Sequence, residues 1–164
     1  SLGEGMIIYY AAKKKEAGAT IEEVRAFVEN EKLHMCHWFT VDDLNYLKRG
    51  GRISAATAAV GTMLSIKPVM HMDNEGHLVA VGKARGRKAA LCQLLDTMGE
   101  LGEGLEGQTT FICHSDCMDD AQYVASQMKE RFGVAQVNIN WIGPVIGAHT
   151  GPGTIGIFFW GRER

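Results

Sequence analysis

The sequence has no run of about 20 consecutive apolar residues, the length that a transmembrane helix needs, and it does not open with a signal-peptide pattern. We therefore expect a cytoplasmic protein with no membrane span. An excess of charge of one sign is also lacking, because 17 lysines and arginines stand against 19 aspartates and glutamates, with a formal net charge of −2. This balance argues against a general nucleic-acid-binding surface.

Catalytic signature motifs are absent as well. The sequence contains no P-loop, no G-x-S-x-G elbow, no H-E-x-x-H motif and no G-x-G-x-x-G after a strand-like run. Its four cysteines form no C-x-x-C pair and are most simply buried apolar side chains. Metal binding stays open for two groups, although zinc sites usually have tighter, recurring spacings. These groups are His34, Cys36 and His37, and Cys113, His114 and Cys117. We expect no metal and no cofactor.

Alternating helical and strand-like patterns indicate an α/β fold. The hydrophobic fraction of 46% and charged fraction of 22% are typical of a globular protein. Apolar periodicity and capping signals predict helices over residues 1–17, 21–32, 41–48, 55–63, 89–101 and 118–131. Strand-like runs occupy residues 35–40, 66–72, 78–82, 109–113, 134–142 and 155–160. Some of these about six strands are joined by helices and one pair by a hairpin, so we expect a mixed sheet with packed helices.

Capping residues indicate where two of the helices begin. Thr20 and Glu23 have the spacing of a capping box, in which each side chain satisfies a backbone amide of the first turn. Thr40 is placed to cap the helix over residues 41–48, and Gly50 stands at the usual glycine position after its end.

The stretch over residues 143–156, GPVIGAHTGPGTIG, is rich in glycine and contains one histidine, His149. Glycines such as Gly147 permit backbone angles that other residues avoid, and they let a ligand or another segment approach closely. This loop is longer than most strand connections need. Two interpretations remain open: a binding loop that presents His149, or an ordinary loop with a solvent-facing histidine.

Two basic stretches and one small-residue stretch are further candidates. Arg49 and Arg52 flank two glycines and could hold a carboxylate or phosphate, or they could be solvated residues at a helix end. The run KARGRK at residues 83–88 contains Arg85 and suits either an anion or partner contact, or a solvated helix entrance. The alanine-rich helix over residues 55–63 can lie close to another core element or to an acyl chain.

Three motifs, in order and at similar spacing, resemble the DegV family of bacterial lipid-binding proteins. They are FTVDDLNYLKRGGRIS at residues 39–54, SIKPVM at residues 65–70 and GAHTGPGTIG at residues 147–156. The likeness covers essentially the whole chain but only the C-terminal part of a family member, in which an N-terminal α/β domain precedes this region. The resemblance implies a helical segment at residues 1–35, near the junction with that domain, and a C-terminal lipid-binding α/β domain at residues 36–164.

The resemblance also implies a function, namely binding a long-chain fatty acid and presenting its carboxylate to a separate kinase subunit that phosphorylates it with ATP. On this interpretation the chain is not itself an enzyme. His149 matches the family histidine at the fatty-acid carboxyl group, and Arg52 and Arg85 match arginines near the ligand head or the kinase surface. The expected binding set is His149, Thr150, Gly147, Arg52, Arg85, Ala56, Ile66 and Ile155, the last three from apolar or small-residue stretches suited to an acyl tail.

Two other functions are weighed against lipid binding. One is a small-molecule enzyme with His149 as general base and arginines as an oxyanion clamp, for which Ser115 or Thr150 would have to serve as nucleophile. The other is a structural role, in which the glycine-rich loop closes a partner interface. The oligomeric state stays open.

Overall fold

The computed structural model describes residues 1–54 and 66–164. The helix expected over residues 55–63, which includes Ala56, lies outside the described residues. Among the described residues, no helix has both the length and the apolar character that crossing a membrane requires.

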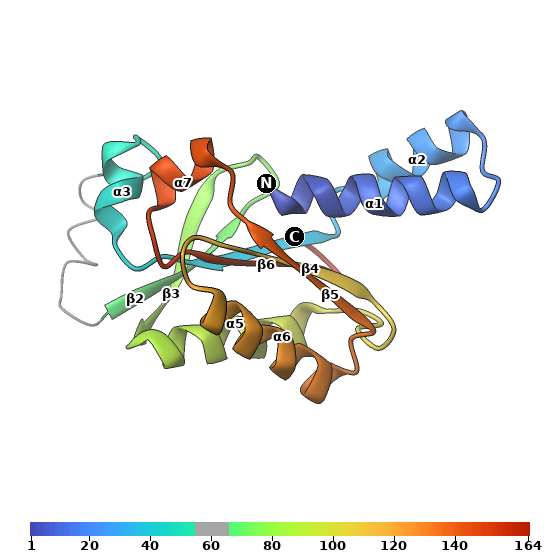
Figure 1. Ribbon diagram of the computed structural model, residues 1–164. Helices are drawn as coiled ribbons and strands as arrows, with labels where there is room; N and C mark the ends of the chain where they lie inside the picture. The colour runs from blue at the N-terminus through green and yellow to red at the C-terminus, as the bar shows by residue number, and fades with distance from the viewer. Residues whose placement is uncertain (55–65) are drawn as a thin grey trace.

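A six-stranded mixed sheet with the order β3-β2-β1-β6-β4-β5 forms the centre of the fold (Figure 1). Neighbouring strands are antiparallel except for β4 and β5, which are parallel. The expected mixed sheet is therefore confirmed. The strands are β1 (Met35–Thr40), β2 (Ile66–Met72), β3 (Leu78–Arg85), β4 (Thr109–His114), β5 (Gln136–Trp141) and β6 (Ile155–Trp160).

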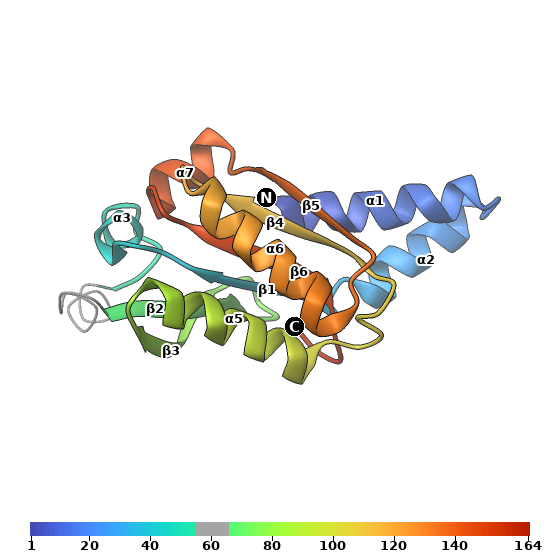
Figure 2. The same cartoon turned by 60° about the horizontal axis from the view of Figure 1, so that its bottom comes forward.

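Helices cover the two faces of the sheet unequally. The long helices α5 (Arg87–Leu101) and α6 (Met118–Phe132) lie side by side on one face, as Figure 2 shows. On the other face lie α1 (Leu2–Glu16), with α2 (Ile21–Glu31) packed beside it, and the short helices α3 (Leu44–Arg49) and α7 (Pro144–Thr150), which contact each other (Figure 1).

Strand β6 takes part in the packing on both faces. Ile155, Ile157 and Phe159 alternate along it and belong to the main core beneath α5 and α6. Phe158 points the other way and packs with Met6 of α1 in a smaller cluster. Strand geometry sends successive side chains to opposite faces, so every second residue of β6 faces the side that carries α1, α3 and α7.

The capping box at Thr20 and Glu23 is confirmed, because the Thr20 hydroxyl accepts a bond from the Glu23 amide while the Glu23 carboxylate accepts one from the Thr20 amide. The predicted cap at Thr40 is wrong. Asp43 caps α3 instead, with its carboxylate accepting from the Asn45 amide at 2.8 Å. Thr40 is the last residue of β1, and its buried hydroxyl donates to the Pro68 carbonyl at 2.7 Å.

The stretch over residues 143–156 is not a continuous loop, since it contains the helix α7. Pro144 stands at the first helical position, where its fixed φ suits a helix and its missing amide costs nothing. Gly151 ends the helix with φ of 78°, a conformation that glycine adopts without strain. A proline at the start and a glycine at the end therefore make a short helix from a glycine-rich sequence.

Candidate ligand-binding site

A cavity of about 300 Å³ opens on the sheet face that carries α1, α3 and α7. Its floor comes from β1 and β6, through side chains such as Phe39 and Phe158, and its walls come from α7 and the β2–β3 hairpin. Most of the lining is apolar. The polar side chains among the lining residues are Ser1, His37, Arg52, His149, Thr150 and Thr154.

His149 lies in the last turn of α7 and is partly exposed. Its ring packs directly on the backbone of Gly50, at the end of α3. A Cβ atom added at Gly50 would overlap the His149 Nδ1 atom and lie 3.1 Å from Cγ. Glycine at position 50 is therefore what lets the imidazole reach this place.

Arg52 also contacts Gly50. It is exposed, lines the cavity, and donates from Nη1 to the Gly50 carbonyl at 2.7 Å. Gly50 thus contacts both the His149 ring and the Arg52 guanidinium, and both of these side chains line the apolar cavity. A guanidinium and an imidazole in this arrangement can both donate to a carboxylate.

Thr150 is buried and lines the cavity, but its hydroxyl donates to the Ile146 carbonyl within α7 at 3.1 Å. Gly147 is an interior residue of the same helix, and its carbonyl accepts a bond from the Gly151 amide at 2.8 Å. These contacts fix the short helix that carries His149.

Three further members of the expected set lie apart from His149. In the described part of the chain, the residues that line the cavity include none of Arg85, Ile66 and Ile155, and Gly147 is not among them either. Arg85 is exposed at the end of β3, opposite Ile66 at the start of β2. Ile155 is fully buried in the core beneath α5 and α6, on the far side of the sheet. Ala56 lies outside the described residues.

Sequence reasoning considered His37 only as a possible metal ligand and missed its place in the cavity, which it lines from β1. Burial, together with the smaller effect of the nearby Arg164 cation, lowers the pKa of His37 to about 3. The Arg164 Nη2 atom lies 3.5 Å from His37 Nδ1. The imidazole is therefore neutral, with Nδ1 placed as the acceptor. Alternation along residues 35–40 could have assigned His37 and Phe39 to one face.

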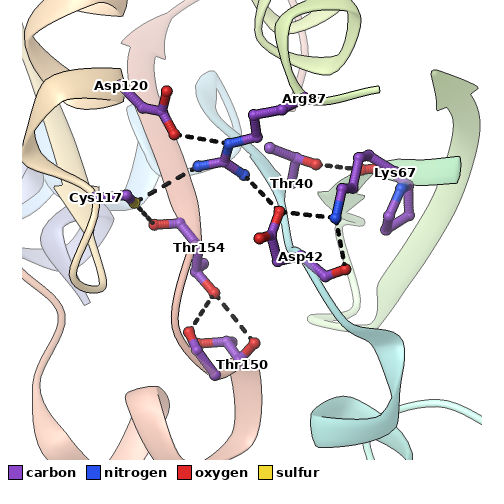
Figure 3. Close-up of polar contacts among 10 residues, drawn as sticks. Thr40, Asp42, Lys67, Arg87, Cys117, Asp120, Thr150 and Thr154 are labelled. Atoms are coloured by element: carbon purple, nitrogen blue, oxygen red, sulfur yellow. Dashed lines mark hydrogen bonds and ion pairs between the residues drawn. The ribbon is translucent and has the colours of Figure 1, made fainter. Parts of the chain in front are cut away.

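A cluster of charged side chains lies at the end of the sheet where β1 and β4 finish (Figure 3). We call Asp42, Lys67, Arg87 and Asp120 the Asp42 cluster. Asp42 Oδ1 is 3.0 Å from Lys67 Nζ and 3.5 Å from Arg87 Nη1. The Arg87 Nε atom donates to Asp120 Oδ2 at 2.8 Å. The two positive and two negative charges cancel, so the cluster offers no excess charge to a ligand.

One group of three possible metal ligands occurs in the described ranges 1–54 and 66–164, namely Asp73, Glu75 and His77 in the β2–β3 turn. The Asp73 carboxylate accepts bonds from the backbone amides of Glu75 and His77, at 3.0 and 2.8 Å. These bonds are typical of a side chain that stabilises a turn. The turn geometry therefore accounts for the acidic residue without an ion.

Comparison with known proteins gives a family match over nearly the whole chain. The model described as "Uncharacterised protein, DegV family" matches residues 1–162. A DegV domain-containing protein of Clostridium perfringens is 46% identical over 163 residues, which cover 99% of this chain and 56% of that protein. The chain therefore spans about half the length of the curated relatives that it matches.

Solved structures give the same result for the fold. A DegV family protein from Thermus thermophilus, described by its fatty acid binding, is 34% identical with a TM-score of 0.86 over 98% of this chain and 57% of that one. The Fatty Acid Kinase (Fak) B3 protein of Streptococcus pneumoniae, loaded with linoleic acid, has a TM-score of 0.85 over 94% of this chain and 54% of that one. At 19% identity, the second likeness concerns the fold alone.

Proposed function

The chain belongs to the DegV family, whose model matches residues 1–162, and on this premise we propose that its cavity binds a long-chain fatty acid. The observation that carries the proposal is that Arg52 and His149 both contact Gly50 and both line an apolar cavity. A fatty acid has the matching chemistry, with one carboxylate and a long apolar tail. The T. thermophilus relative, described by its fatty acid binding, supports this choice.

The carboxylate is proposed to accept hydrogen bonds from Arg52 and His149. A carboxylate that leaves water needs such donors, because burying an unpaired charge is costly. The tail would lie along the apolar floor over Phe39 and Phe158, where each buried methylene contributes about 0.8 kcal/mol. The proposal covers the part of the site that this chain supplies, and Gly147 and Thr150 serve it by shaping α7.

We further propose that the bound carboxylate is presented to a separate kinase. The motif resemblance at residues 39–54, 65–70 and 147–156, which implies this role, supports it. Arg52 and Arg85 are both exposed, so both are free to meet an acidic surface, and complementary charge speeds such docking. On this view Arg85 belongs to the docking surface, which fits its distance from the cavity. Residues 36–164 would form the lipid-binding domain, with residues 1–35 as the adjoining helical segment.

Binding is preferred to catalysis because neither of the two candidate nucleophiles fits the role: Thr150 uses its hydroxyl within α7, and Ser115 is not among the residues that line the cavity. The Thr150 hydroxyl donates to the Ile146 carbonyl. The Ser115 amide donates to the Thr154 carbonyl, and the Ser115 carbonyl accepts from the Gly153 amide. These backbone bonds hold the segment before β6. A general base needs its nucleophile within hydrogen-bond reach.

Mass spectrometry of an organic-solvent extract of the purified chain, beside an unrelated protein prepared identically, tests for a bound fatty acid. Titration with oleate and with methyl oleate then tests the head group. We expect His149→Ala to weaken oleate binding about 10–100-fold, because a hydrogen bond to a charged group contributes about 1.5–3 kcal/mol, and to leave methyl oleate binding nearly unchanged. Equal weakening of both ligands would contradict the head-group assignment.

A further inference from the structure

The Asp42 cluster connects elements from both faces of the sheet (Figure 3). Asp42 follows β1 and directly precedes Asp43, the residue that caps α3. Lys67 belongs to β2, and besides its ion pair it donates to the Asp42 carbonyl at 3.1 Å. Arg87 is the first residue of α5, and Asp120 lies in the first turn of α6. The cluster therefore links the start of α3, on one face of the sheet, to the starts of α5 and α6 on the other face.

Asp42 also supports the segment that follows α7. Gly153 has φ of +75°, and a Cβ atom added there would lie 2.8 Å from Asp42 Cγ and 2.9 Å from Oδ2. The backbone at Gly153 therefore rests on the Asp42 carboxylate. On its other side, the Gly153 amide donates to the Ser115 carbonyl at 2.7 Å. The segment is held between Asp42 and Ser115, four residues after His149.

A second chain of contacts runs from the same cluster to the end of α7. Arg87 Nη2 donates to Cys117 Sγ at 3.6 Å, and Cys117 Sγ donates to the Thr154 carbonyl at 3.3 Å. The buried Thr154 hydroxyl then donates to the carbonyls of Thr150 and Gly151, at 3.1 and 2.9 Å. Figure 3 shows this path from Arg87 to the last turn of α7.

From these contacts we infer that Asp42 is a positioning residue for the carboxylate site. Its carboxylate fixes the start of α3, which leads to Gly50 and Arg52, and it fixes the segment that follows His149. The ion pairs to Lys67 and Arg87 hold that carboxylate in place. Asp42 thus sets the spacing between Arg52 and His149 without touching the ligand. The inference rests on the proposed function for the ligand, although the placement of His149 can be measured without one.

Removing an ion pair that only stabilises the fold should leave the His149 signal and the oleate affinity unchanged. The chain offers such a pair as a matched control. Arg131 of α6 donates to Asp96 of α5 at 2.6 Å, so this pair also joins two elements, but it does so between the two helices of the opposite face. Arg131→Gln removes it and leaves the contacts of α3 and α7 intact. Asp42→Asn keeps the shape of the side chain against Gly153 while removing its charge.

The experiment compares the wild-type chain with Asp42→Asn, Arg87→Gln and Arg131→Gln. The first readout is the ¹H–¹³C NMR signal of the His149 imidazole, assigned by its loss in His149→Gln. The second is the ratio of the dissociation constants for oleate and methyl oleate. We expect Asp42→Asn and Arg87→Gln to shift or broaden the His149 signal. They should also weaken oleate binding about tenfold, which is the loss expected when one hydrogen bond to a charged group is broken. Methyl oleate binding should change less than about twofold, and Arg131→Gln should change neither readout.

A His149 signal in Asp42→Asn that matches the wild type would overturn the inference, as would an equal shift in Arg131→Gln. If the wild type binds neither ligand, the proposed function fails while the NMR comparison still decides the positioning role. If near-ultraviolet circular dichroism shows that Asp42→Asn is not folded, Lys67→Gln, which removes one cation of the cluster, is judged by the same two readouts.

Discussion

Replacing Gly50 by alanine tests the candidate site through a single added methyl group. Gly50 has φ of −75° and ψ of −4°, a conformation open to any residue. Without neighbours, the substitution would therefore stabilise the fold by about 0.4–1 kcal/mol through the unfolded chain. The methyl group instead overlaps the His149 ring, so the imidazole must leave its place against Gly50.

The expected loss follows from the hydrogen bond that His149 is proposed to give the carboxylate. Such a bond to a charged group contributes about 1.5–3 kcal/mol, so oleate should bind to Gly50→Ala about 10–100-fold more weakly. Isothermal titration calorimetry with oleate measures this change. Gly5→Ala is the matched control, because the added methyl group would only make an ordinary contact of 3.6 Å with Leu2. We expect Gly5→Ala to bind oleate as the wild type does.

A double-mutant cycle identifies His149 as the cause. In the His149→Ala background the ring is absent, so Gly50→Ala should have almost no further effect on oleate binding. The reasoning would be refuted if Gly50→Ala bound oleate like the wild type. It would equally be refuted if the loss persisted in full in the His149→Ala background.

Ile155→Val should lower the free energy of unfolding by about 0.5–1.5 kcal/mol and leave the oleate dissociation constant unchanged, because Ile155 faces the core beneath α5 and α6. Phe158 lies on the cavity side, so Phe158→Ala should weaken the binding of oleate and of methyl oleate alike. His37 has its pKa lowered to about 3 in the folded chain from 6.5, so its stabilising contribution is complete above pH 6.5 and is lost as the pH falls towards 3. Urea unfolding should show that the wild type loses about 2 kcal/mol more than His37→Gln between pH about 7.5 and about 5, and an equal loss in both would contradict the assignment. Arg85→Glu should slow acyl phosphate formation by a bacterial fatty acid kinase and ATP while leaving oleate affinity intact; a parallel loss of affinity would instead indicate that Arg85 contacts the ligand.

Much of the fold was predictable because each element carries a local signal. The period of apolar residues distinguishes helices from strands, and one hairpin among helix connections implies a mixed sheet. Start positions were harder to predict, since Thr40 and Asp43 are both good capping residues. Thr40 continues β1 because its hydroxyl is satisfied by the Pro68 carbonyl, a contact between residues far apart in the sequence.

The site was predictable in part, for a different reason. His149 and Arg52 were chosen from their motifs, and the structure brings them together at Gly50, although their binding roles stay predictions. Ile155 was chosen from a strand that is apolar at every position, IGIFFW, in which no alternation reveals the cavity side. The choice between its two faces depends on what covers each face of the sheet. That information is not local to the strand.

The placement of β6 has a consequence for how a ligand would enter. β6 is paired on both sides, with β1 and β4, and Ile155–Phe159 are buried, so its amides should be among the slowest to exchange with deuterium. Two helices beside the cavity are different: α7, which forms a wall, and α3, which supplies Leu47 to the lining, have 7 and 6 residues, well below the about 12–15 at which an isolated helix becomes stable. We therefore expect fast exchange in these two helices and slow exchange in the floor, so that a ligand comes and goes by local opening of the walls.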